Sequence, residues 1–160
     1  MIQRVQSLLL LFIAVLGIIF SFSPILELII QDETYIMNAY NTYQFSEEEG
    51  INLVTFRNIG IGILGGVTIL LALVIIFLFK NRGPQMLLSK LLLLLLTFQV
   101  VAIFVYLDAA KAFLNPTKLV LSLSYKIGIF LPFFSLVLAY LTIRFIKKDD
   151  ELVRSADRLR

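Results

Sequence analysis

Few side chains in this 160-residue sequence could carry covalent chemistry. Cysteine, histidine and tryptophan are absent, which excludes a disulfide, a thiolate metal site, a cysteine nucleophile and an imidazole base. The carboxylates that could do acid–base chemistry include Glu27, Glu47, Glu48, Glu49 and Asp108. None has a recognisable base or metal partner, so we interpret them as solvated charges. The sequence therefore predicts a protein that is not an enzyme and holds no cofactor or metal.

One amide, Gln99, lies deep within an apolar segment. Because a buried amide must find hydrogen-bond partners, we expect it to face neighbouring helices rather than lipid. We favour a polar contact that packs helices together over a substrate site. The hydroxyls of Thr68, Ser135 and Thr142 can instead bond to carbonyls of their own helices. No Asp, Glu, Lys or Arg lies unpaired at mid-membrane depth, which argues against a transporter or pump.

The segments that position these residues are long and apolar. Residues 59–79 contain no charge, a turn follows over residues 80–84, and residues 86–107 contain only Lys90. At ~1.5 Å per residue each segment is ~32 Å long, enough to cross a hydrocarbon core of ~30 Å. We expect the helix to stop before Gly83 and Pro84, since proline lacks an N–H and restricts the preceding residue.

Two further segments, residues 8–30 and 127–146, complete a predicted set of four spans. The mean hydropathy of +0.94 favours lipid as the solvent. A cleaved signal peptide is the rival interpretation of the first segment, but Ser21-Phe22-Ser23 followed by Pro24 is a poor cleavage site. The predicted fold class is an all-α membrane protein: a four-helix transmembrane bundle over residues 1–146, with an amphipathic cytoplasmic tail over residues 147–160.

The polar connections predict a small extracytoplasmic cap. Residues 34–36 and 42–45 favour a short two-stranded β-hairpin, whereas a capping box at residues 46–49 favours a competing helical turn. Residues 119–125 alternate apolar and small polar side chains, which is compatible with an extended segment. The third helix can continue to Leu114, before Asn115 and Pro116 end it.

The placement of the cations predicts the orientation. With both ends in the cytoplasm, ten Lys and Arg residues lie inside and four lie outside. The inverted arrangement would place ten outside, against the tendency of cations to remain in the cytoplasm. We therefore expect both termini in the cytoplasm.

Gly62 and Gly66 match a GxxxG pattern, which allows close approach of two helix backbones. The pattern is compatible with a dimer interface, but we favour packing against another helix of the same chain. Gly65 adds a third residue without a side chain to this helix face, so the pattern does not fix which residues of the partner helix pack against it.

The tail has an apolar stripe at helical spacing, flanked by charges of both signs, which is typical of a docking surface. It could dock on the chain's own short loops or on another protein; the alternative is a solvated anchor. The predicted docking residues are Leu152, Val153, Arg154, Ala156, Asp157, Arg158 and Leu159.

Three short stretches resemble a known family. They are residues 1–6 (MIQRVQ), residues 125–132 (YKIGIFLP) and residues 148–160 (KDDELVRSADRLR). They are similar to the bacterial membrane family catalogued as domain of unknown function 4293. The resemblance implies a four-span inner-membrane protein of Gram-negative bacteria and implies no activity.

The predicted function is that of a structural or accessory subunit of a membrane assembly, acting by binding. The alternative is a carrier or binder of a lipid-like ligand in a groove between helices. The expected partners are the lipid bilayer and either a membrane protein or a second copy of the chain, with no nucleic acid.

Overall fold

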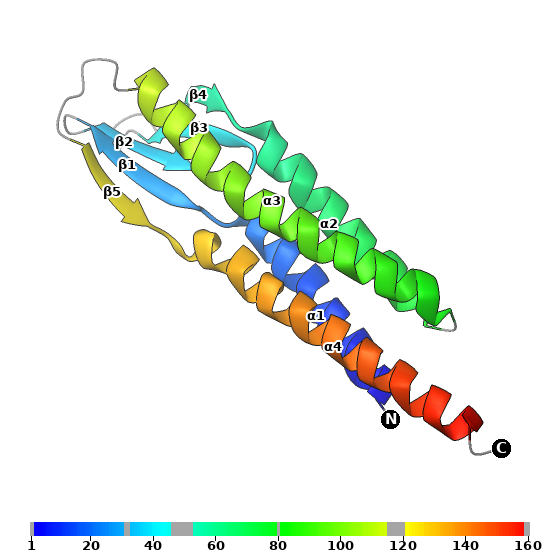
Figure 1. Ribbon diagram of the computed structural model, residues 1–160. Helices are drawn as coiled ribbons and strands as arrows, with labels where there is room; N and C mark the ends of the chain where they lie inside the picture. Colours follow the sequence, from blue (N-terminus) through cyan, green and yellow to red (C-terminus); the bar gives the residue numbers. More distant parts are fainter. Residues whose placement is uncertain (1, 31–32, 46–52, 80, 115–120, 159–160) are drawn as a thin grey trace.

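The computed structural model describes residues 2–30, 33–45, 53–79, 81–114 and 121–158. Within these residues, four helices run side by side and a small antiparallel sheet lies at one end of them (Figure 1). The helices are α1 (Ile2–Phe22), α2 (Ile59–Phe77), α3 (Arg82–Leu114) and α4 (Phe130–Arg158). The strands are β1 (Leu26–Ile30), β2 (Glu33–Met37), β3 (Asn41–Phe45), β4 (Leu53–Arg57) and β5 (Leu121–Tyr125). The start of α1 and the end of α4 lie away from the sheet, at what we call the helix end (Figure 1).

Each helix packs against two neighbours, α1 and α3 both lying between α2 and α4. The inward stripe of α3 follows a three- and four-residue spacing: Gln85, Ser89, Leu92, Leu96, Gln99, Ile103, Leu107 and Ala110. The outward faces are also apolar, with exposed Phe98, Val105 and Phe134 among them. Among the described residues, four helices are long and apolar enough to cross a membrane, by length and composition.

The first predicted span, residues 8–30, is helical only in part. The helix α1 ends at Phe22, and Leu26–Ile30 is the strand β1. Pro24 lies between them, and its ring and missing N–H disfavour further helix. The predicted set of four long apolar helices is present, and the predicted cap is a five-stranded antiparallel sheet, so the chain is mostly helical rather than all-α.

The sheet has five strands in the order β4-β3-β2-β1-β5. The predicted hairpin is confirmed as β2 and β3, and the predicted extended segment is confirmed over the five residues of β5. Strand β1 lies between β2 and β5, with Leu28 opposite both Tyr35 and Leu123. Its inward residues join a core with Ile103 and Leu107 of α3, so the last turns of α3 cover the inner face of the sheet. The capping box at residues 46–49 lies outside the described residues.

Asn58 joins the sheet to the bundle, directly before α2. Its side-chain amide donates to the Asn38 carbonyl, and its Oδ1 accepts from Thr42 Oγ1 at 3.3 Å. Its own backbone N–H donates to the Tyr40 carbonyl at 3.0 Å. Asn58 is fully buried, so its side chain cannot bond to water. These hydrogen bonds satisfy its polar atoms instead. We call these contacts the Asn58 junction.

The connection from α2 to α3 differs from expectation. Arg82, Gly83 and Pro84 belong to the first turn of α3, so the helix break lies before Arg82 rather than at Gly83 and Pro84. Proline fits there because the first N–H groups of a helix have no intrahelical partner. The predicted end of α3 at Leu114 agrees with the structure.

Candidate functional site

Gln99 lies inside the bundle and faces α2. A Cβ placed on Gly65 would lie 3.4 Å from Gln99 Nε2, so the missing side chain makes room for the amide. The Thr68 hydroxyl donates to the Gly65 carbonyl at 2.8 Å and lies 3.5 Å from Gln99 Oε1. Because the hydroxyl has one proton, the shorter bond takes it and the contact with Gln99 is weak. Gln99 therefore contacts α2 mainly by packing.

The void beside Gln99 is small. It has a volume of about 10 Å³ and is lined by all four helices, including Phe20, Thr68, Leu96 and Ser135. That is room for about one water molecule and far too little for an acyl chain. Ser135 and Thr142 donate to carbonyls of their own helix, as expected. This layer offers an amide and hydroxyls but no charged group to a ligand.

Gly62 and Gly66 have different surroundings, although the sequence pattern groups them. Gly62 is covered by the ring of Tyr40, and the Ala39 carbonyl lies 3.1 Å from the position of a Cβ. Gly66 faces open space, with no atom within 4 Å of that position. Gly65, between them, is the glycine that packs against Gln99 and Phe20. Self-association through Gly66 stays a prediction.

The carboxylates near the sheet are engaged in structural contacts. Glu27 was expected to be solvated, but it is partly buried and forms an ion pair with Lys126. That pair joins β1 to the segment between β5 and α4. Asp108 pairs with Lys111 at 3.4 Å on the same helix. Within the described ranges, no three residues gather as ligands for a metal ion.

A second carboxylate, Glu33, accepts a hydrogen bond from the Tyr35 hydroxyl at 2.6 Å. Burial, this hydrogen bond and the nearby negative charge raise the pKa of Tyr35 to about 12. The phenol therefore stays protonated at neutral pH and serves as a donor within the sheet. The residues Glu47, Glu48 and Glu49 lie outside the part of the chain that the structure describes.

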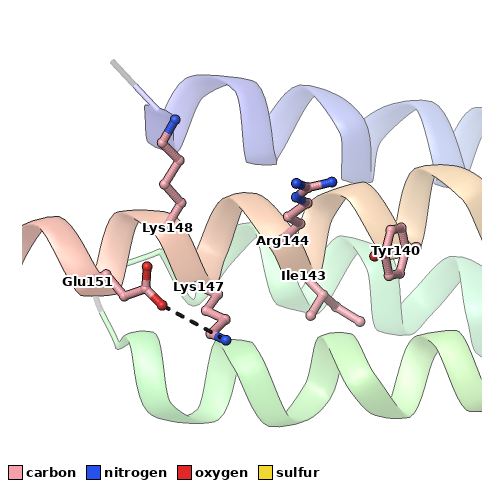
Figure 2. Close-up of a pocket in the computed structure, with 6 residues that line it drawn as sticks. All are labelled: Tyr140, Ile143, Arg144, Lys147, Lys148 and Glu151. Atoms are coloured by element: carbon pink, nitrogen blue, oxygen red, sulfur yellow. Dashed lines mark ion pairs between the residues drawn. The ribbon is translucent and has the colours of Figure 1, made fainter.

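A hollow with a volume of about 750 Å³ lies on the outward face of α4 near the helix end (Figure 2). Its lining residues form two rows with a four-residue spacing, which places each row along one side of a helix. One row is Tyr140, Arg144 and Lys148; the other is Ile143, Lys147 and Glu151. We call this hollow the α4 groove.

The charge of the α4 groove is positive. Lys147 Nζ lies 3.9 Å from Glu151 Oε1, in a solvent-exposed pair of little strength. Arg144 and Lys148 form no ion pair with another described residue and point together toward the side on which α1 lies (Figure 2). In the sequence these cations indicated only the orientation; their four-residue spacing was the signal that could have indicated a shared helix face.

The family follows from the sequence comparison. A family model described as a domain of unknown function (DUF4293) matches residues 2–159. The chain belongs to this family. The match confirms the resemblance seen at the two ends of the sequence. No curated protein matches the chain.

In this DUF4293 chain, the predicted tail is an extension of α4. The helix continues without a break to Arg158, and Leu152 is half exposed on it. The residues Val153, Arg154, Ala156, Asp157 and Arg158 belong to the helix, but their side chains lie outside the described part, as does all of Leu159. Their role in docking stays a prediction.

The extension of α4 is fixed to the bundle by Arg82. Its guanidinium lies 3.3 Å from Asp149 Oδ2 and donates to the Asp149 carbonyl, also at 3.3 Å. The two side chains are 27% and 17% exposed, so solvent screens this pair less than a surface pair. The contact holds the connection between α2 and α3 against α4 at the helix end of the DUF4293 fold.

Proposed function

We propose that this protein spans the bacterial inner membrane four times, with both ends in the cytoplasm, and acts as an accessory subunit of a membrane assembly. It binds a protein partner through the end of α4. The observation that carries this proposal is the length of α4 together with its contact to Arg82. The helix has 29 residues, or ~43 Å, of which a hydrocarbon core takes ~30 Å. The remainder is a fixed helical arm outside the membrane.

Binding fits the described side chains better than catalysis does. The interior-facing polar residues at mid-bundle are Gln99, Thr68 and Ser135, which are neutral and engaged with their own helices or neighbours. The carboxylates near the sheet hold structural contacts. A lipid-like ligand between the helices is the weaker candidate, since the void beside Gln99 has a volume of about 10 Å³.

The orientation is tested with reporter enzymes that work only outside the cytoplasm. We expect activity when the reporter is inserted in the turn near Asn41 and none when it follows Arg160. The reason is the division of the cations, ten of which lie at the predicted inner side. An active fusion at Arg160 would contradict both the orientation and the even number of spans.

The partner is tested by affinity purification in mild detergent with mass spectrometry. Leu152→Asp places a charge on the predicted docking stripe, whereas Asn81→Asp adds the same charge to the exposed turn at the same end. We expect a stoichiometric protein partner with the wild type and with Asn81→Asp, and loss of that partner with Leu152→Asp. Retention of the partner by Leu152→Asp would contradict docking through α4.

A further inference from the structure

The α4 groove lies where the apolar part of its helix gives way to charge. Residues 127–143 carry no charge, and Arg144, Lys147 and Lys148 follow directly. At ~1.5 Å per residue, Ile127 and Arg144 are separated by ~26 Å, close to the ~30 Å thickness of a hydrocarbon core. The three cations are therefore spaced to reach one headgroup layer when the helix spans a bilayer.

We propose that the α4 groove binds the headgroup phosphate of an anionic phospholipid. This inference rests on the proposed membrane insertion and is independent of the proposed protein partner. The groove presents three cations and one carboxylate, so its charge complements an anion. Its volume of about 750 Å³ is open to the surroundings of the bundle, where a lipid molecule would lie.

The two rows of the groove have different roles in the proposed binding of phosphate. Arg144 offers a planar fork that matches two phosphate oxygens, and Lys148 adds a point charge on the same side (Figure 2). Glu151 pairs with Lys147, and both belong to the second row. The cations of the first row, Arg144 and Lys148, therefore remain available to the anion. Tyr140 lies one turn toward the middle of the span, at the depth where aromatic side chains gather near headgroups.

The surface beyond Tyr140 suits the acyl chains of the same lipid. Val137 is 58% exposed and Phe134 is 61% exposed, and both lie on α4 toward the sheet. A single helix face therefore carries cations, then a tyrosine, then bare apolar side chains. This order matches the order of groups in a phospholipid from headgroup to tail.

The test uses a tryptophan introduced at Val137, because the chain has none of its own. The reporter protein is reconstituted in phosphatidylcholine vesicles that contain, at equal mole fraction, either brominated phosphatidylglycerol or brominated phosphatidylcholine. Bromine on the acyl chains quenches a nearby indole, so the ratio of the two quenching levels measures preference for the anionic lipid. Each cation near an anionic surface contributes about fivefold in affinity. We expect a preference of about fivefold or more.

Two double variants of the reporter protein separate the groove from general surface charge. Arg144→Gln with Lys148→Gln should remove most of the preference. Arg154→Gln with Arg158→Gln removes the same charge from the same helix beyond the groove and should leave the preference nearly unchanged. An equal loss of the anionic-lipid preference in the two double variants would overturn the proposal. Retention of that preference by Arg144→Gln with Lys148→Gln would also overturn it and would favour an acidic protein segment as the ligand of the groove.

The remaining outcomes distinguish the groove from the membrane insertion on which it rests. Quenching that is equal for the two brominated lipids contradicts binding of anionic lipid in the groove but remains consistent with membrane insertion. No quenching by either lipid overturns the insertion itself. Displacement of the anionic preference by inorganic phosphate at constant ionic strength identifies a site for free phosphate and also overturns the proposal.

Discussion

The two ends of the molecule are built by different means. At the sheet end, strand hydrogen bonds, the Asn58 junction and the ion pair of Glu27 with Lys126 join the strands to one another and to the helices. At the helix end, the described contacts include an ion pair between Arg82 and Asp149, and the α4 groove has exposed cations. Satisfied polar groups stabilise a fold, whereas exposed cations beside an apolar surface are available to a ligand. This difference supports a structural role for the sheet end and the proposed binding role for the helix end.

The largest expected effect on stability comes from the Asn58 junction. Asn58→Ala leaves the partly buried Asn38 carbonyl and the buried Thr42 hydroxyl without this partner. Since each such group costs ~1–3 kcal/mol, we expect a loss of about 2–4 kcal/mol in the free energy of unfolding. Denaturant unfolding in detergent measures it, with Asn81→Ala in the exposed turn as the control. Equal stability of the two variants would remove the structural distinction between the ends.

The second effect concerns the two glycines of α2. Gly62→Ala forces the ring of Tyr40 to move, which costs ~1–3 kcal/mol as overpacking does elsewhere. Gly66→Ala meets open space and should gain ~0.5–1 kcal/mol, because alanine favours a helix over glycine. Thermal unfolding of both variants in detergent gives the two signs. A destabilised Gly66→Ala that also loses self-association would support the dimer interface.

The ion pair of Arg82 with Asp149 should contribute less to stability than the Asn58 junction. We expect a coupling of about 1 kcal/mol between Arg82→Gln and Asp149→Asn in a double-mutant cycle, because the pair is only partly buried. The more exposed pair of Lys147 with Glu151 serves as the control and should couple weakly. A coupling at Arg82 as large as the effect of Asn58→Ala would show that both ends are equally fixed.

Gln99→Leu should have the smallest effect. The contact with Thr68 is 3.5 Å long, and interhelical hydrogen bonds in membranes average ~0.6 kcal/mol. We expect mild destabilisation by thermal unfolding and an unchanged bundle. A folded Gln99→Leu protein that loses its role in the cell would contradict this expectation and identify Gln99 as part of a site.

The helices were predictable from sequence because hydropathy and length are local properties. The strand β1 was not, since Leu26–Ile30 continues the apolar run of α1 and its partner β5 lies more than 90 residues later. The hairpin of β2 and β3 was visible because its two strands are adjacent in the sequence. Gly62 and Gly66 looked equivalent because the pattern carries no information on what Tyr40 covers. The α4 groove required knowing which helix face remains outside the bundle.

The pairing of β1 with β5 also sets an order for biosynthesis. Strand β1 leaves the ribosome early and pairs on one side with β2. Its other side pairs with β5, so that pairing must wait until residues 121–125 have been made. During that interval β1 is an open edge, the kind of strand that recruits another chain. A chain truncated within α3 would lack β5 and would therefore keep this edge of β1 unpaired.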